Sequence, residues 1–397
     1  MEKALYNPRM ETLPRQELCA LQLGKLKTYL SRCYHHSAFY RERFDAAGVH
    51  PQMLKTLDDL RRFPLTYKRD LRAEQEAHPY FGRIPICAPG DRREMHPSTG
   101  TTGRPVHTIW TQSDISYFTE MGARVYRGMG VRAGDVIQNA LGQGLWAGGI
   151  SVQYFAFALG CFIVPVGASM TERQIDFLVN LKTNVLVATP SFALYLSEQL
   201  RERGYGPQNL DVRVGIFGGE AGTALPATRR LLEEGLRVQA YDHYGLTEIG
   251  ASFAGECWAK EGIHWWEDYH VFEALHPETL EPVPEGETGV LVVTHLEREG
   301  FPLIRYWTGD LVQVVTGPCP CGRTHARSPG GVRGRADDMV IFAGINFYPT
   351  QVEQVVLVTD DEMRTALRLL LERCTLAAAL LGAAAVAALL AGKIQVP

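Results

Sequence analysis

The feature that most constrains the fold is an alternation of short apolar runs with longer amphipathic stretches, which begins near Val131. The runs at 135–139, 161–165, 184–188 and 212–217 are typical of buried strands, and the stretches at 171–181 and 191–203 are typical of helices. Strands of a parallel sheet are apolar throughout because helical connections cover both faces of the sheet. The sequence therefore predicts an α/β fold with a mainly parallel sheet between helices.

The regions on either side of this core have different patterns. In residues 1–75, leucines such as Leu18, Leu21 and Leu26 recur near helical spacing between basic residues, which predicts amphipathic helices. The runs at 271–275, 289–295 and 311–315 are separated by turns and predict antiparallel strands of a smaller β-rich unit. Because 397 residues exceed one ordinary domain, we expect two or three folded units. The segment after Gly334 is short, and we place a large domain over 1–334 and a small α+β domain over 335–397.

Charge and cysteine content limit the partners and the compartment. The net charge of −4 provides no broad basic field, so nucleic acid is not an expected partner. The N-terminus carries charges throughout and has no apolar signal core, and eight cysteines without a signal favour reduced thiols in the cytoplasm. Residues 374–392 are uncharged and long enough to span a bilayer. Their alanine content and the lack of an aromatic belt favour a buried helix instead.

The sharpest chemical motif is Ser98-Thr-Gly-Thr-Thr-Gly-Arg-Pro105. Its glycines let successive backbone N–H groups turn into one concavity, and its hydroxyls add neutral donors for phosphate oxygens. It is not a Walker A loop, because no Gly-Lys-Ser/Thr closes it. A plain surface loop has a similar composition, but the density of hydroxyls favours a phosphate loop.

A second motif is Tyr241-Asp-His-Tyr-Gly-Leu-Thr-Glu248. The ring of Tyr244 beside Gly245 offers a flat surface for a purine, Thr247 can donate to a phosphate, and Glu248 is a hard oxygen ligand suited to Mg²⁺. Taken alone, the same residues are equally typical of a strand–turn–helix boundary with Thr and Glu at the helix start.

Two further motifs follow. In Arg305-Tyr-Trp-Thr-Gly-Asp310, the aspartate can accept two hydrogen bonds from ribose hydroxyls or can simply belong to a turn. The stretch 334–349 joins charged residues, including Arg335 and Asp337, to a strand and a glycine turn. This pattern is typical of a hinge or of a plain domain linker.

In this order and spacing, the four motifs resemble those of the adenylate-forming superfamily of acyl-CoA synthetases, adenylation domains and luciferases. Within that superfamily the chain resembles the phenylacetate–CoA ligase family, from about residue 15 to about Gln354. The resemblance implies a large N-terminal region of stacked sheets with helices, a β-rich subdomain and a small mobile C-terminal domain. Dimers are common in the family, so the resemblance allows a homodimer, although the sequence leaves the oligomeric state open.

The resemblance also assigns roles to individual residues. A loop around the β- and γ-phosphates of ATP would comprise Ser98, Thr99, Gly100, Thr101, Thr102 and Gly103, and the adenine would lie against Gly219, Glu220, Tyr244 and Gly245. Thr247 would contact the α-phosphate, Glu248 would hold Mg²⁺, and Asp310 and Arg335 would bind the ribose. Asp337 would be the hinge.

The implied reaction joins a carboxylic acid to ATP and then to a thiol. Attack of the carboxylate on the α-phosphorus gives an acyl-adenylate and pyrophosphate, and the thiol of coenzyme A then releases AMP. The family region near the acid corresponds to 142–155, where Trp146 and Tyr154, together with His243, are candidates to contact the substrate. Aromatic residues there favour an aromatic acid, although in an apolar run they are often plain core.

A separate group of residues is suited to a metal. Cys257 and His264 precede Cys319-Pro-Cys321, and this Cys₃His set matches tetrahedral structural Zn²⁺. His325 is a substitute ligand, and unpaired cysteines in turns are the alternative. Some members of the phenylacetate–CoA ligase family resemble this arrangement.

The C-terminal region departs from the family pattern. About sixty residues follow the hinge, and a unit of that size buries a marginal core. Lys393, in Gly392-Lys393, stands where the family has a catalytic lysine that contacts the carboxylate and the α-phosphate. Besides the CoA ligase, two alternatives therefore stay open: an adenylating enzyme that loads a carrier protein or an amine, and a degenerate nucleotide-binding protein without ligase activity.

Overall fold

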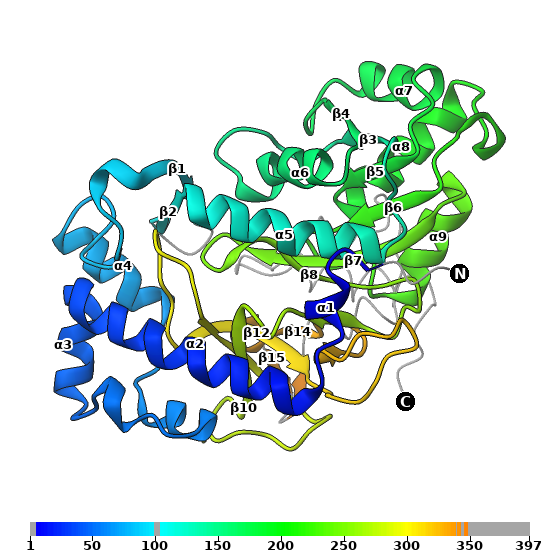
Figure 1. The fold of residues 1–397 in the computed structure, drawn as a ribbon. Helices are drawn as coiled ribbons and strands as arrows, with labels where there is room; N and C mark the ends of the chain where they lie inside the picture. Colours follow the sequence, from blue (N-terminus) through cyan, green and yellow to red (C-terminus); the bar gives the residue numbers. More distant parts are fainter. Residues whose placement is uncertain (1–4, 99–103, 339, 343–344, 348–397) are drawn as a thin grey trace.

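The computed structural model describes residues 5–98, 104–338, 340–342 and 345–347 (Figure 1). The N-terminal region is helical, as the leucine spacing predicts, with α1 (Pro8–Glu11), α2 (Arg15–His36), α3 (Ala38–Ala46), η1 (Pro51–Met53), η2 (Leu57–Arg62), α4 (Lys68–Ala77) and η3 (Pro89–Asp91). The stretch 374–392 lies outside the described residues. Within the described ranges, no helix is both long enough and apolar enough to cross a membrane.

An eight-stranded sheet forms the centre of the molecule. Its strands are β3 (Val136–Asn139), β4 (Phe162–Pro165), β5 (Val185–Ala188), β6 (Val214–Phe217), β7 (Gln239–Leu246), β8 (Gly250–Gly255), β9 (Ile263–Trp265) and β13 (Arg327–Ser328), in the order β13-β9-β8-β7-β6-β5-β3-β4. From β4 to β7 neighbouring strands are parallel, and from β7 to β13 they are antiparallel. The predicted parallel sheet is confirmed for the four apolar runs.

Helices cover both faces of the parallel half, which explains its apolar strands. In β5, Val185 and Val187 join a core cluster with α5 (Gln112–Gly128) and α6 (Ala147–Ala158). Leu186 and Ala188 point to the other face and join a cluster with α7 (Thr171–Asn180), α8 (Pro190–Glu202) and α9 (Pro226–Leu236). A 3₁₀ turn, η4 (Pro207–Asn209), connects α8 to β6. Alternate residues thus bury two separate cores.

The smaller β-rich unit is also confirmed, although the third strand, predicted at 311–315, lies at 306–313, so that Asp310 belongs to this strand and not to a turn. Strands β10 (His270–Leu275), β11 (Thr288–His295), β12 (Tyr306–Gln313) and β14 (Gly334–Arg335) form an antiparallel sheet in that order, followed by η5 (Ala336–Asp338). Helix α2 runs across the front of this sheet in Figure 1, and Gln22 Nε2 donates to His270 O at 2.9 Å. Because β14 pairs with β12, the proposed domain boundary at residue 334 falls inside this sheet.

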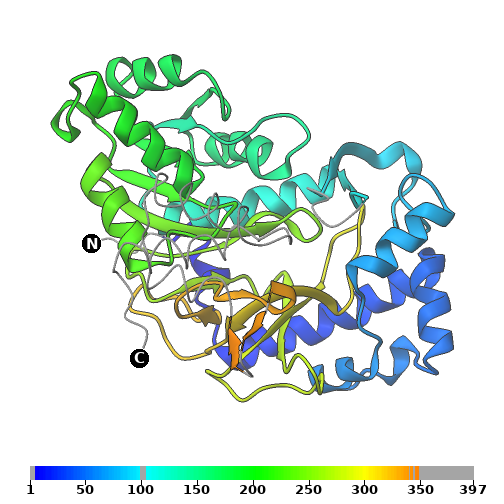
Figure 2. The same ribbon diagram turned by 180° about the vertical axis from the view of Figure 1, so that it is seen from behind.

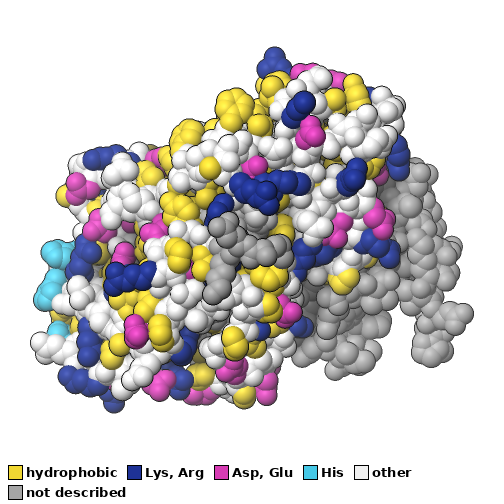
Figure 3. All heavy atoms as spheres, turned by 45° about the vertical axis from the view of Figure 1, so that its right-hand side comes forward, with side chains coloured by type: hydrophobic (Ala, Val, Ile, Leu, Met, Phe, Trp, Pro, Cys, Tyr) yellow, Lys and Arg dark blue, Asp and Glu magenta, His cyan; other side chains and the backbone are white. Residues whose placement is uncertain are grey.

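Two hairpins complete the described fold. Strands β1 (Arg92–Pro97) and β2 (His107–Thr111) pair antiparallel, as do β15 (Val340–Phe342) and β16 (Ile345–Phe347). Helix α4 lies beside the first hairpin (Figure 2), where Gln75 exchanges hydrogen bonds of 2.7 and 2.9 Å with the backbone of His107. On the face drawn in Figure 3, acidic and basic side chains are interspersed, as the small net charge leads one to expect.

The structure excludes one of the two alternatives that the second motif left open. The residues around Thr247 and Glu248 do not begin a helix, because β7 turns there and returns as the antiparallel strand β8. Gly245 permits the return, since a Cβ at this position would lie 2.0 Å from Ala251 O. Thr and Glu are as suitable in this turn as at a helix start, so composition alone does not distinguish a β-turn from the start of a helix.

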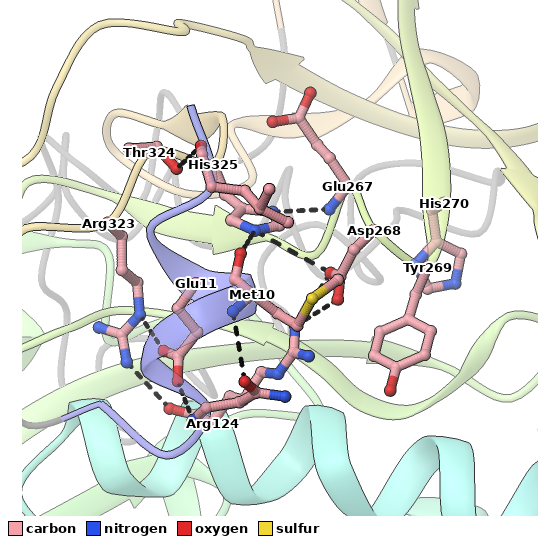
Figure 4. A network of polar contacts seen from close by, with 12 residues as sticks. Met10, Glu11, Arg124, Glu267, Asp268, Tyr269, His270, Arg323, Thr324 and His325 are labelled. Carbon is pink, nitrogen blue, oxygen red and sulfur yellow. Dashed lines mark hydrogen bonds and ion pairs between the residues drawn. The ribbon is translucent and has the colours of Figure 1, made fainter. Parts of the chain in front are cut away.

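The N-terminal segment is fastened to the loop after β12 by a buried ion pair (Figure 4). Arg323 Nε donates to Glu11 Oε2 at 2.6 Å, and neither side chain is more than 1% exposed. The other oxygen of Glu11 accepts the backbone N–H groups of Tyr6 and Asn7, each at 2.7 Å. Next to the pair, His325 Nε2 donates to Met10 O at 2.9 Å. The carboxylate is thus fully satisfied, so its loss leaves a buried cation without its counter-ion.

We predict that Glu11→Ala lowers the free energy of unfolding by about 3 kcal/mol, because the Arg323 guanidinium stays buried without this carboxylate. Denaturant unfolding followed by circular dichroism measures the effect. The control is Glu17→Ala, an exposed position on α2, where we expect a change within about 0.5 kcal/mol. If the two substitutions lowered the free energy of unfolding equally, the buried ion pair would not make the proposed contribution to stability.

Candidate active site

The turn between β7 and β8 places Thr247 and Glu248 on the wall of a cavity of about 690 Å³. Glu248 is 3% exposed, and the nearest cation is Lys68, whose Nζ lies 2.8 Å from Glu248 Oε1. That oxygen makes no hydrogen bond of good geometry within the described residues. A buried carboxylate oxygen with free lone pairs, beside a cavity, is a suitable ligand for Mg²⁺.

A buried arginine holds the backbone of this turn. Arg298 Nη1 donates to Ile249 O at 2.8 Å and also to Glu248 O. The loop that carries Arg298 is itself fixed by Asp114, whose carboxylate accepts the N–H groups of Glu299 and Gly300 at 2.8 Å each. Burial lowers the pKa of Arg298 from its ordinary value, and Asp114 opposes that shift. The turn therefore rests on side chains from α5 and from the segment after β11.

The same cavity contains two of the three candidates for acid binding. Trp146 and His243 line it together with the small residues Ala147 and Gly148. Burial lowers the pKa of His243 to about 4, so the ring is neutral at physiological pH. Its Nδ1 atom is buried without a hydrogen-bond partner among the described residues. Both side chains are thus placed to contact a ligand.

The third candidate has a different position. The Tyr154 hydroxyl donates to Glu94 on β1, and Tyr154 is not among the described residues that line the two cavities at this site. The other oxygen of Glu94 lies 3.0 Å from His96 Nε2. Tyr154 therefore ties α6 to β1 and does not line either cavity.

A second cavity of about 630 Å³ adjoins the first and shares Gly219, His243, Gly245 and Arg335 with it. Glu220, Tyr244 and Asp310 line the second cavity. The Tyr244 hydroxyl donates to Asp310 Oδ2, and Arg335 Nη1 lies 3.0 Å from Asp310 Oδ1. Residues 310 and 335 meet because they are register partners in β12 and β14.

The electrostatics of this group follow from burial. Burial raises the pKa of Asp310 to about 6, although Arg335 and the Tyr244 hydroxyl act in the opposite direction. Arg335 also forms an ion pair of 2.9 Å with Asp337, the residue at the expected hinge. A carboxylate next to a guanidinium and a phenol provides both acceptors and donors for a polyhydroxylated ligand.

The first residue of the Ser/Thr/Gly motif lies at the end of the first hairpin. Ser98 lines the first cavity, and its Oγ accepts Val106 N at 3.0 Å. Its backbone N–H donates to Val106 O at 2.8 Å, which extends the pairing of β1 with β2. The motif residues Thr99, Gly100, Thr101, Thr102 and Gly103, and also Lys393, lie outside the described residues.

The predicted metal ligands come together away from both cavities. The ligand atoms of Cys257, His264, Cys319 and Cys321 all lie within 4.8 Å of one another, and all four residues are buried. Cys257 Sγ is 3.7 Å from Cys319 Sγ, too far for a disulfide. Cys321 Sγ is 3.5 Å from His264 Nε2. His325 is not a member, because its Nδ1 accepts Glu267 N at 2.9 Å.

This group has the spacing and charge of a metal centre. Tetrahedral ligands at a Zn–S distance of about 2.3 Å are about 3.8 Å apart, which the observed separations approach. Hydrogen bonds with Cys319 and Cys321 raise the pKa of Cys257, whereas hydrogen bonds from Cys257 and Cys319 lower the pKa of Cys321. Three thiols this close cannot all ionise unless a cation compensates them, so the group could hold a metal ion.

Comparisons with known proteins agree with this geometry. Residues 50–296 match the AMP-binding enzyme family. The chain belongs to that family. It is 43% identical to the phenylacetate-coenzyme A ligase of Thermus thermophilus over 90% of this chain and 79% of that protein. It is 37% identical to the phenylacetate-coenzyme A ligase of Escherichia coli over 88% of this chain and 78% of that protein.

Solved structures show the same fold. The structure of 2-hydroxyisobutyryl-CoA ligase with 2-HIB-AMP in the postadenylation state superposes with a TM-score of 0.85 at 31% identity, covering 89% of this chain and 75% of that one. An open conformation of that ligase with 2-HIB-AMP and CoA gives a TM-score of 0.83 and covers 93% of this chain and 84% of the other. The expected adenylate-forming fold is therefore confirmed.

Two residues of this AMP-binding enzyme site were missed by sequence reasoning. Lys68 lies in a helix that was expected only to pack, and Arg298 lies in a charged segment, Glu297–Glu299, typical of a surface loop. Lys68 reaches the cavity because α4 packs against β12, and Arg298 is buried because Asp114 folds its loop inward. No local signal distinguishes either from an ordinary surface cation.

The depressed pKa of His243 predicts a loss of stability in acid. The folded value of about 4 lies below the ordinary 6.5, so between these pH values the unfolded chain binds a proton that the folded chain does not. We expect this group to remove about 2 kcal/mol of stability between pH 7 and pH 5. The pH dependence of denaturant unfolding in His243→Gln should be shallower than in the wild type by this amount. In His36→Gln, at an exposed position, it should not change.

Proposed function

We propose that this chain is an AMP-forming acid–CoA ligase, which activates a carboxylic acid with ATP and transfers the acyl group to the thiol of coenzyme A. One observation carries the proposal. The two adjoining cavities share Gly245 and Leu246 at the end of β7, so that Thr247 and Glu248, which line the first cavity with Trp146, directly follow residues that also line the second cavity with Tyr244 and Asp310. An enzyme that joins an acid to a nucleotide needs both sites at one point.

The described residues divide the chemistry between them. Asp310 and Arg335 would bind the ribose hydroxyls, Tyr244 and Gly219 would border the adenine, and Thr247 would donate to the α-phosphate. Glu248 would hold Mg²⁺, which supplies charge neutralisation at the phosphates when bound. Trp146 and the neutral ring of His243 would position the acid.

Roles outside this group are also part of the proposal. Ser98, with the motif residues 99–103, would hold the terminal phosphates, and Lys393 would contact the carboxylate and the α-phosphate. Asp337 would serve as the hinge between the half-reactions.

For the acid, we propose an aromatic, phenylacetate-like compound. The flat side chain of Trp146 lines the first cavity and packs against glycines, since a Cβ on Gly219 would come within 3.2 Å of the indole. The relatives named phenylacetate-coenzyme A ligase point to the same class, whereas the 2-hydroxyisobutyryl-CoA ligase structures make small hydroxy acids the natural competitor. A carrier protein or an amine as acceptor, a homodimer and a cytoplasmic location remain secondary proposals.

We expect the wild type to catalyse ATP–pyrophosphate exchange with phenylacetate and not with fatty acids or 2-hydroxyisobutyrate. Glu248→Gln should lower the exchange rate by at least about a hundredfold, because it removes the charge that holds Mg²⁺. Addition of coenzyme A should then convert the adenylate to the thioester and AMP. Binding of ATP without exchange for any acid would instead favour a degenerate nucleotide-binding protein.

For the Cys₃His group we propose structural Zn²⁺, because soft thiolates with one imidazole suit this ion and all four positions are filled by protein. We expect about one zinc per chain by elemental analysis. Cys319→Ser should lose the metal and lower the free energy of unfolding by at least about 2 kcal/mol. Cys161→Ser, outside the group, should keep both the zinc content and the free energy of unfolding of the wild type. A purified protein without metal and unaffected by Cys319→Ser would refute the site.

A further inference from the structure

Helix α4 is fixed to the rim of the first cavity by the residues before it. Thr66 N donates to Arg305 O and Trp307 N donates to Thr66 O, both at 2.9 Å, so Thr66 joins the start of β12 like a short strand. The Asp70 carboxylate then accepts Tyr67 N at 3.0 Å and caps the first turn. As a result, Lys68 begins the helix at a defined position opposite the β7–β8 turn.

Lys68 is the cation that meets the buried carboxylate of this turn. Its Nζ lies 2.8 Å from Glu248 Oε1, while its side chain keeps 34% of its surface exposed. The neighbouring basic residues of α4 also line the cavity but have other contacts, since Arg69 lies over the Tyr67 ring and Arg72 Nε donates to Arg104 O at 2.9 Å. Among these three basic residues, Lys68 is the one that forms an ion pair with Glu248.

Glu248 Oε1 already pairs with the Lys68 ammonium, and its proposed role would bring Mg²⁺ to the same carboxylate. A divalent ion on Glu248 would repel the ammonium, whose flexible four-carbon stem carries three donors and suits a phosphate as a point charge. The ammonium would stay in the first cavity, which Ser98, the first residue of the motif expected to hold the terminal phosphates, also lines. Lys68 would pair with Glu248 in the nucleotide-free enzyme, and the divalent ion would neutralise Glu248 once Lys68 binds phosphate. The Glu248 carboxylate would therefore have a cationic partner in both states.

We propose that Lys68 pairs with Glu248 in the nucleotide-free enzyme and binds the β- and γ-phosphates of Mg–ATP, and hence the pyrophosphate leaving group. This inference rests on the proposed function. In that reaction a carboxylate oxygen forms a bond to the α-phosphorus, and the bond from this phosphorus to the bridging oxygen breaks. Pyrophosphate leaves with the electron pair of the broken bond, and Lys68 stabilises that charge.

The proposed role of Lys68 predicts opposite changes in two affinities, a lower one for Mg–ATP and a higher one for a free divalent ion. In Lys68→Met, the affinity for Mg–ATP and for magnesium pyrophosphate, measured by calorimetry, should fall at least about tenfold, while the affinity for AMP stays within about twofold. The affinity of the nucleotide-free variant for Mn²⁺ alone should rise, because the competing ammonium is gone. Lys68→Arg should recover most of the pyrophosphate affinity, and Lys55→Met, at an exposed position, should behave as wild type.

A purely structural role would give a different pattern. Equal losses for ATP and AMP, or weaker Mn²⁺ binding in Lys68→Met, would overturn the inference. Should Lys68→Met fail to fold, the same measurements on Lys68→Gln decide the question. The inference fails, and the proposed function stands, if the wild type catalyses ATP–pyrophosphate exchange but Lys68→Met binds magnesium pyrophosphate as tightly as the wild type does. Selective loss of ATP affinity in a protein without exchange activity supports the inference and defeats the function.

Discussion

The site depends on a change of strand direction within one sheet. Strand β7 pairs parallel with β6 on one edge and antiparallel with β8 on the other. The parallel half requires helices on both faces, and the antiparallel half requires only a tight turn. The carboxyl end of β7 lies at this change of direction, and both cavities are lined by residues of that end. Ligand sites in α/β sheets commonly occupy such a position outside the carboxyl ends of strands.

That position is costly to maintain, because it concentrates buried charge. Glu248, Asp310 and Arg298 are each almost completely buried, and an isolated buried charge is strongly unfavourable. Each is compensated from a distant segment: Lys68 for Glu248, Arg335 for Asp310, and the field of Asp114 for Arg298. The N-terminal helices and the smaller sheet therefore have an electrostatic role as well as a packing one.

Local pattern was enough to predict the framework. The four apolar runs became β3, β4, β5 and β6 within one or two residues, because strands between two layers of helices are largely apolar. The edge strand β4 is the exception in burial, since Phe162 is exposed. The Cys₃His set was also predicted, since few residue types bind soft metals and their spacing is distinctive. Around Thr247 the local signal was ambiguous, and the pairing of β8 with β7 decided the outcome.

The sequence by itself determined the class of fold, the order of its elements and the residue types available for nucleotide, acid and metal, since these follow from local periodicity and side-chain chemistry. The tertiary structure alone decided which of these residues meet. The register of β12 with β14 brings Asp310 to Arg335, and the pairing of Thr66 with Trp307 brings Lys68 to Glu248. Such contacts depend on burial and on strand register across hundreds of residues, and no local pattern encodes either of them.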